Sequence, residues 1–213
     1  MIVKKPWFTV VYMFVLTAFF SSAVIALSRA TRERVETNRR IALERAVLEA
    51  LAVALPADAS ALELHALFTQ QVRPPAAESH GAFRRVADGR TLAYALPVEG
   101  RGFWAPVRAV VGLDADRQTL TGLAVYEQNE TPGLGAEIAK PGFTGQFRGR
   151  RLGAHAPRLR FKRPGLPRAE NEVHAVTGAT QTSVRLERII NAAVDRWLQR
   201  MNERHAPGSA QTR

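Results

Sequence analysis

The sequence predicts an α+β protein in which one N-terminal transmembrane helix precedes a mainly antiparallel sheet with packed helices. Three patterns predict this class: an uncharged apolar run opens the chain, three segments of strand composition occupy its centre, and a helical apolar stripe lies near its end. After one membrane segment, the 213 residues leave enough chain for a single domain with a core. We expect four parts: an N-terminus and anchor (1–28), a helical membrane-proximal region (29–75), the main domain (76–201) and a polar tail (202–213).

The apolar run extends from Trp7 to Leu27 and contains no charged residue. At 1.5 Å per residue, a helix of this length spans about 30 Å, which matches the hydrocarbon core of a bilayer. The run therefore predicts one transmembrane helix. A cleaved signal peptide is the alternative, because Lys4 and Lys5 precede the run, but the stretch is long and no Ala-x-Ala site follows it. Charge alone does not fix the orientation, because a second basic group follows the run: Arg29, Arg32, Arg34, Arg39 and Arg40.

Two helices are expected between the anchor and the main domain. The segment Thr31 to Ala54 has apolar residues at helical intervals with charges between them, which is typical of a helix leaving the bilayer. Ser60 and Glu63 form a capping-box pattern that opens a second helix to about Val72. The prolines of the run Arg73 to Ala76 end that helix, so this run marks a linker or the start of the main domain.

The centre of the chain predicts strands at Thr91 to Val98, Ala105 to Leu113 and Thr119 to Glu127. The last two strands are separated by Asp114 to Gln118, which we interpret as a hairpin turn. The Pro-Gly pair that follows breaks the pattern and precedes a short helix or loop near Phe143 to Phe147.

The last element is an amphipathic helix from Ser183 to Met201. Its apolar residues recur at helical spacing and form one wide face, comprising Leu186, Ile190, Ala193, Val194, Trp197, Leu198 and Met201. We expect this face to pack on the sheet as core rather than to line a cofactor site.

The composition limits the chemistry. The chain has no cysteine, which excludes disulfides, thiolate-ligated iron–sulfur clusters and thiol nucleophiles. Any redox chemistry must therefore come from a borrowed cofactor. The five histidines have no metal-ligand spacing, so we expect no metal site, and no hydrolase or dinucleotide fingerprint is present.

The formal net charge is +11, and cations are dense in one stretch: Arg148, Arg150, Arg151, Arg158, Arg160, Lys162, Arg163 and Arg168. Aromatic residues are sparse there and no nucleic-acid motif is recognisable, so we expect no nucleic-acid partner. A solvated face and attraction to anionic headgroups or to an acidic partner protein remain as the alternatives.

Two motifs remain. The first, Val176 to Ser183, places hydroxyls and a glycine at the start of the last helix, where backbone N–H groups and the helix dipole favour an anion. The second, Glu130 to Gly135, is a Pro-Gly turn with a carboxylate at its start, which allows the backbone to approach a flat ligand closely. Each motif alone has a simpler interpretation, as an N-cap and as a turn. Together they indicate a phosphate anchor and a ring pocket.

The pair resembles the FMN-binding domain shared by the C subunit of Na⁺-translocating NADH:quinone reductase and the G subunit of Rnf electron-transport complexes. The family hallmarks are Glu-Thr-Pro-Gly-Leu-Gly and Ser/Thr-Gly-Ala-Thr-x-Thr, whose last threonine carries FMN through a phosphoester bond. That threonine is Thr182 here. The resemblance covers roughly Tyr94 to Trp197 and includes Gly102 to Pro106 and Tyr126 to Gln128. One position departs from the pattern, because His174 stands where the family usually has aspartate.

The resemblance implies that Thr182 is the covalent acceptor of FMN, that Thr177 to Thr180 and Ser183 surround the phosphate, and that Glu130 to Gly135 lie beside the isoalloxazine ring. The full cofactor-binding set is Thr177, Gly178, Ala179, Thr180, Gln181, Thr182, Ser183, Glu130, Thr131, Pro132, Gly133, Leu134 and Gly135. No residue of this chain is expected to be catalytic by itself.

Two functions follow as expectations. The first is a membrane-anchored flavoprotein with covalent FMN that carries electrons within an ion-translocating redox complex, rather than an enzyme on its own. Its partners would be the other membrane subunits and a flavin transferase. We expect a single pass through the bacterial inner membrane with the FMN domain on the periplasmic side. The alternative is a flavin-free interaction or scaffold protein that keeps the fold.

Overall fold

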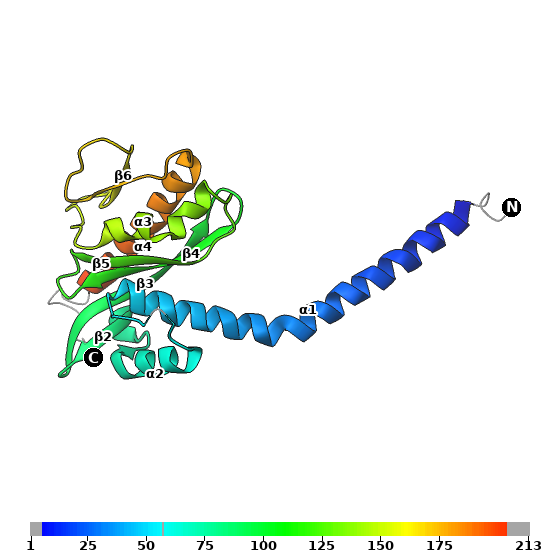
Figure 1. Ribbon diagram of the computed structural model, residues 1–213, viewed down its shortest axis with the longest axis horizontal. Helices are drawn as coiled ribbons and strands as arrows, with labels where there is room; N and C mark the ends of the chain where they lie inside the picture. Colours follow the sequence, from blue (N-terminus) through cyan, green and yellow to red (C-terminus); the bar gives the residue numbers. More distant parts are fainter. Residues whose placement is uncertain (1–5, 57, 204–213) are drawn as a thin grey trace, which may run out of the picture. The chain divides into compact units, whose positions relative to one another are not determined.

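The computed structural model describes residues 6–56 and 58–203 (Figure 1). Lys4, Lys5 and the tail beyond residue 203 lie outside the described residues. The chain divides into two compact units, Met1–Arg40 and Ile41–Arg213. The functional boundaries expected after residues 28, 75 and 201 stay predictions.

The first unit contains the N-terminal part of helix α1, which extends over Pro6–Ala50. Every residue from 7 to 40 is exposed, and the apolar side chains include Phe14, which is 73% exposed. Among the described residues, α1 is the one helix long and apolar enough to cross a membrane. The apolar surface needs a lipid environment, which indicates a membrane anchor.

The second unit is built on a five-stranded antiparallel sheet in the order β1-β2-β3-β4-β5. The strands are β1 (Val72–Arg73), β2 (Phe83–Ala87), β3 (Arg90–Arg101), β4 (Pro106–Asp114) and β5 (Leu120–Glu127). The three predicted strands and the α+β class are confirmed. β1 and β2 were not predicted, because β1 has two residues and β2 carries adjacent arginines that interrupt the alternation.

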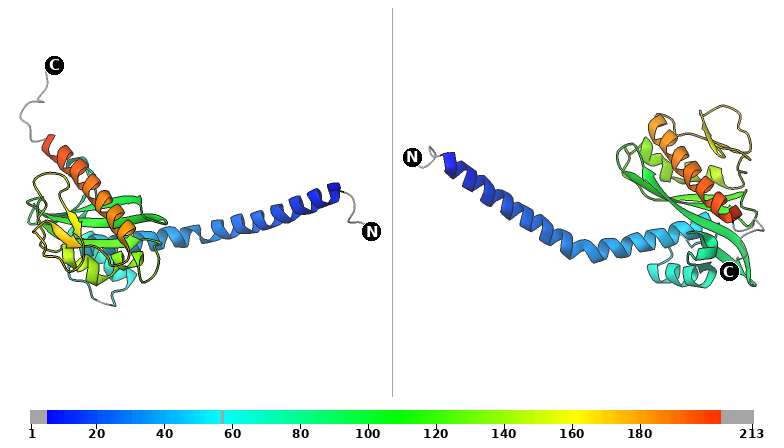
Figure 2. Two further views of the ribbon diagram at one scale, coloured as in Figure 1. Left: turned by 90° about the horizontal axis from the view of Figure 1, so that it is seen from above. Right: turned by 180° about the vertical axis from the view of Figure 1, so that it is seen from behind.

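Each face of the sheet supports its own core, because alternate side chains of a strand point to opposite faces. Leu96 and Val111 join the core beneath α4 (Thr180–Glu203), whereas their neighbours Ala95 and Val110 join the core beneath α2 (Ala61–Gln71) and the end of α1. Figure 2 shows these helices on opposite sides of the sheet. The apolar stripe predicted for the last helix is buried in the core beneath α4, except for Ala193, which is partly buried and packs against this core.

The Ser60–Glu63 capping box is present as predicted. The Glu63 N–H donates to Ser60 Oγ at 3.3 Å, and the Ser60 N–H donates to Glu63 Oε2 at 2.9 Å. These bonds satisfy two N–H groups that the start of α2 otherwise leaves free.

The expected helical end at Ala54 was wrong, because α1 stops at Ala50 and Ala52 adopts a left-handed backbone with φ of 53°. The Thr121 hydroxyl donates to the Ala50 carbonyl at 2.6 Å. Gly112 on the neighbouring strand leaves space for this contact, because a Cβ there would overlap the Ala50 carbonyl oxygen and Thr121 Oγ1. The sheet therefore holds the helix end in a slot that only glycine allows.

After β5 the chain forms η2 (Gly135–Ala139), α3 (Pro141–Thr144) and η3 (Gly145–Phe147), which agrees with the predicted break and short helix. A small parallel pair, β6 (Arg160–Lys162) and β7 (Glu172–His174), was not predicted, because β6 lies in the arginine-rich stretch and each strand has only three residues. Several of that stretch's cations have partners: Lys162 contacts Glu172 at 3.1 Å and Arg150 donates to the Ala169 carbonyl at 3.3 Å. The Ala169 N–H and the Lys162 ammonium hold the pKa of the Glu172 carboxyl below its usual value.

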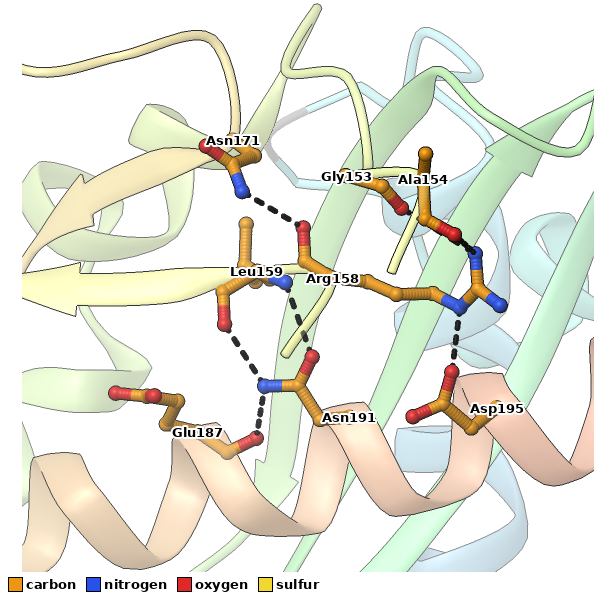
Figure 3. Close-up of polar contacts among 8 residues, drawn as sticks. All are labelled: Gly153, Ala154, Arg158, Leu159, Asn171, Glu187, Asn191 and Asp195. Atoms are coloured by element: carbon orange, nitrogen blue, oxygen red, sulfur yellow. Dashed lines mark hydrogen bonds and ion pairs between the residues drawn. The ribbon is translucent and has the colours of Figure 1, made fainter. Parts of the chain in front are cut away.

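Side chains of α4 fix the segment that leads into β6 (Figure 3). The Asn191 amide accepts from the Leu159 N–H at 3.0 Å and donates to the Leu159 carbonyl at 2.8 Å. One turn further along the helix, Asp195 pairs with Arg158, whose guanidinium also donates to the Gly153 carbonyl. The Asn191 side chain therefore satisfies the buried N–H and carbonyl groups of Leu159, as the backbone of a neighbouring strand would.

Candidate functional site

The predicted motifs meet in one pocket. Three segments form it: the loop after β3, the turn after β5 and the first turn of α4. The pocket has a volume of about 310 Å³ and is lined by Phe103, Trp104, Glu130, Thr131, Leu134, Gly135, Gly178, Ala179, Thr180, Gln181 and Thr182. Nine of the thirteen predicted site residues are in this lining. Pro132 and Gly133 are exposed in the turn, while Thr177 and Ser183 line an adjacent hollow of about 490 Å³ that also contains Arg163 and Val176.

The centre of the pocket is a hydrogen bond between two buried side chains. Thr182 Oγ1 donates to Glu130 Oε2 at 2.8 Å. Thr182 is 4% exposed and Glu130 is 5% exposed, so water competes little for this bond. The two residues are 52 positions apart in the sequence, and only the folded chain brings the two motifs into contact.

The second oxygen of Glu130 is held by the backbone. Oε1 accepts from the Phe103 N–H at 2.8 Å and from the Trp104 N–H at 3.1 Å. Such charge-assisted bonds to a carboxylate are about twice as strong as neutral ones. The carboxyl group therefore has a defined position and orientation beside Thr182.

Two glycines make the space for this pair. A Cβ at Gly102 would overlap Glu130 Oε1, and one at Gly135 would lie 2.7 Å from Thr182 Oγ1 and 2.8 Å from the Glu130 Cβ. Any side chain at either position must move the carboxyl or the hydroxyl. Each of the two glycines thus has a specific steric role at the site.

The turn after β5 is fixed by its own hydrogen bonds. The Thr131 carbonyl accepts from the Leu134 and Ala136 N–H groups, both at 3.1 Å. Gly133 adopts a φ of 72°, which suits glycine. The Glu130 N–H donates to Gln128 Oε1 at 2.7 Å. These bonds hold Glu130 at the pocket floor.

The helix beside the pocket begins earlier than predicted. α4 starts at Thr180 rather than Ser183, and the Ser183 N–H donates to the Ala179 carbonyl at 3.0 Å. Thr182 therefore lies within the first turn, where the N–H groups have no carbonyl inside the helix. Ser183 Oγ accepts from the Val176 N–H at 3.1 Å, so this oxygen caps the backbone of the preceding loop.

The aromatic residues at the rim of the pocket were not among the predicted site residues. Phe103 and Trp104 are 43% and 67% exposed, and their rings form a T-shaped pair with centroids 5.0 Å apart. The Arg185 guanidinium lies 5.8 Å from the centroid of the Phe103 ring. The run Gly102 to Pro106, which is part of the family resemblance, contains both residues and could have indicated them.

His174 lies outside the lining of the pocket. It is in β7, where its Nε2 lies 2.9 Å from the Leu166 carbonyl and its N–H donates to Gln146 Oε1 at 2.9 Å. The position that departs from the family pattern therefore lies outside both the pocket lining and the Thr182–Glu130 contact.

The arrangement suits a ligand with an anionic group and a flat ring. The first turn of α4 offers N–H groups and the positive end of a helix dipole to an anion. The exposed aromatic rim and Leu134 offer apolar surface to a ring. Thr182 supplies a hydroxyl at the floor of the pocket, held by a carboxylate. FMN has both a phosphate and a flat ring, so these residues fit it.

Comparison with known proteins defines the class. Residues 102–195 match the family model of the FMN-binding domain, and this segment contains the whole pocket. The chain therefore contains an FMN-binding domain.

Individual relatives indicate the type of FMN-binding domain more specifically than the family model does. Over 91 residues the chain is 41% identical to the C subunit of the Na⁺-translocating NADH-quinone reductase of Vibrio vulnificus, and over 93 residues it is 40% identical to that of Yersinia pestis. It is homologous to these C subunits in this segment, which covers 41% of this chain and only 36% and 34% of the two relatives.

Solved structures extend the similarity to the fold. The crystal structure of the C subunit from Parabacteroides distasonis matches with a TM-score of 0.68 at 20% identity, over 85% of this chain and 98% of that one. NqrC of Shewanella oneidensis matches with a TM-score of 0.65 at 21% identity, over 79% and 98%. The second unit therefore has the NqrC fold.

Proposed function

We propose that this protein is a membrane-anchored electron-carrier subunit that holds FMN covalently on Thr182, within an ion-translocating complex of the NADH:quinone reductase or Rnf type. The observation that carries the proposal is the buried Thr182–Glu130 contact inside a matched FMN-binding domain. The homology to the C subunits of NADH-quinone reductases supports the same function.

The chain's own residues would position the cofactor. The hydroxyl of Thr182 is the attachment point, and the start of α4, from Thr180 to Thr182, offers N–H groups to the phosphate. Phe103, Trp104 and Leu134 form the apolar rim beside the ring. When bound, FMN supplies one- and two-electron transfer, which a chain without cysteine lacks.

The partners are part of the proposal. Other membrane subunits of the complex would supply and remove the electrons, and a flavin transferase would attach the FMN. The helix α1 would anchor the protein in the bacterial inner membrane.

The flavin-free scaffold remains as the second candidate, because His174 replaces the aspartate that the family motif usually has. An absorbance spectrum distinguishes the two functions. We expect the full chain, purified in detergent after coexpression with a flavin transferase, to show the flavin bands near equal molarity with protein. A colourless protein that is correctly folded would support the scaffold instead.

The orientation gives a separate prediction. A reporter fused after residue 213 should be active on the periplasmic side, because Lys4 and Lys5 favour an internal N-terminus and the family resemblance implies a periplasmic FMN domain. The arginines after the span favour a cytoplasmic C-terminal domain instead, so the reporter decides between the two orientations. A reporter active only in the cytoplasm would overturn the orientation and leave the flavin proposal standing.

A further inference from the structure

The contact between Thr182 and Glu130 has the geometry of a nucleophile and its base. An alcohol is a weak nucleophile at neutral pH and needs a neighbouring base to remove its proton. Such a base must lie within about 2.6–3.2 Å of the hydroxyl. The distance from Thr182 Oγ1 to Glu130 Oε2 is 2.8 Å, and the hydroxyl donates to the carboxyl.

The surroundings of Glu130 fit an ionised carboxylate. Its side chain is contacted by three donors among the described residues, which are the N–H groups of Phe103 and Trp104 and the Thr182 hydroxyl. A carboxylate accepts all three bonds. Because two of them go to Oε1, Oε2 faces the hydroxyl and can take its proton.

The space for the Glu130 carboxyl and the Thr182 hydroxyl depends on two glycines. Gly102 and Gly135 leave room for the carboxyl and the hydroxyl that a methyl group at either position would remove. We propose that Glu130 is the internal base that activates Thr182 for attachment of the flavin phosphate; this inference rests on the proposed function.

The attachment step transfers a flavin phosphate to the hydroxyl. Thr182 Oγ1 attacks the flavin phosphorus of a flavin donor that carries this phosphate in a phosphoanhydride, such as FAD. The new bond is Oγ1–P, the anhydride P–O bond breaks, and AMP leaves. The hydroxyl proton passes to Glu130 Oε2. No electron is transferred in this step.

The proton then has a structural use. An esterified Thr182 no longer donates a hydrogen bond, so an ionised Glu130 would place a bare oxygen 2.8 Å from the ester oxygen. With the transferred proton on Oε2, the hydrogen bond between the two groups is kept with its direction reversed. The same pair therefore accommodates the chain before and after attachment.

The test is Glu130→Gln in the full chain, assayed with purified flavin transferase and FAD. The amide keeps an oxygen for the Phe103 and Trp104 N–H groups and turns an NH₂ toward Thr182, so the fold is retained while the base is lost. Removing a general base costs about 10²- to 10⁴-fold in rate. We expect the initial labelling rate, read from flavin fluorescence in denaturing gels, to fall by about 10²-fold or more, while the variant still unfolds in one cooperative transition.

The control is Glu137→Gln, which removes the same charge from a residue that pairs with Lys140 at 2.8 Å. It should label at the wild-type rate. Equal rates for wild type and Glu130→Gln would refute the base and leave the proposed function intact, whereas an unlabelled wild type would refute the proposed function itself.

A second variant, Gly135→Ala, provides a test if Glu130→Gln does not fold. Gly135→Ala keeps the carboxylate but places a methyl group against Thr182 Oγ1 and 3.0 Å from Glu130 Oε2. Labelling should slow in this variant because the 2.8 Å contact between the hydroxyl and the carboxylate is lost, and an unchanged rate would overturn the base.

Discussion

Gly112→Ala is expected to destabilise the second unit by about 3 kcal/mol or more. The added methyl group has no free space here, so backbone and side-chain atoms must shift. The new Cβ overlaps the Ala50 carbonyl oxygen and Thr121 Oγ1 and lies 2.6 Å from the Ala50 carbonyl carbon. The end of α1 must then leave the sheet, and with it Val47, Leu48 and Leu51, which are all at most 1% exposed.

Chemical denaturation of the full chain in detergent, followed by tryptophan fluorescence, measures this effect, because Trp197 is buried in the core. The matched control is Gly142→Ala, since a Cβ at Gly142 meets nothing within 4 Å. The stability of this control should stay within about 0.5 kcal/mol of wild type. If the two alanine variants unfold together, the slot for the helix end is not a determinant of stability.

Thr182→Val is expected to abolish covalent flavin. Valine has nearly the same shape but no hydroxyl, so no ester can form, and Glu130 Oε2 loses its 2.8 Å partner. An unsatisfied buried acceptor costs about 1–3 kcal/mol, so the variant should fold with reduced stability. In-gel flavin fluorescence after coexpression with the transferase should fall from full labelling to background.

Thr180→Val is the control for Thr182→Val. It removes a hydroxyl from the same pocket lining, at an exposed position two residues earlier. We expect this variant to keep the label. Fluorescence retained in Thr182→Val and lost in Thr180→Val would assign the attachment to Thr180.

Local signals accounted for much of the fold. The Ser60–Glu63 pair located the start of α2, and the segments of strand composition located the three long strands, because both signals act over a few residues. β2 was missed because Arg84 and Arg85 obscure a strand that is paired on both sides by tertiary structure. The end of α1 at Ala50 depends on Gly112, which is distant in the sequence and gives no local sign of this role.

The site, like the fold, combines features that the sequence predicted with contacts that only the folded chain makes. The family resemblance identified the two motifs, and the structure brings most of their residues into one pocket. Their connection was not predictable, because the turn motif was expected beside the ring, whereas Glu130 contacts Thr182 itself. The backbone of Phe103 and Trp104, which holds the other carboxyl oxygen, belongs to a third segment that no spacing rule links to the first two.

Covalent attachment of FMN to Thr182 is tested by the mass of the tryptic peptide Ala169–Arg185 from the full chain coexpressed with a flavin transferase. We expect a peptide heavier by one FMN less one water, with fragment ions that place the added mass on Thr182. An unmodified peptide from a correctly folded protein, or an FMN on any residue other than Thr182, would contradict it.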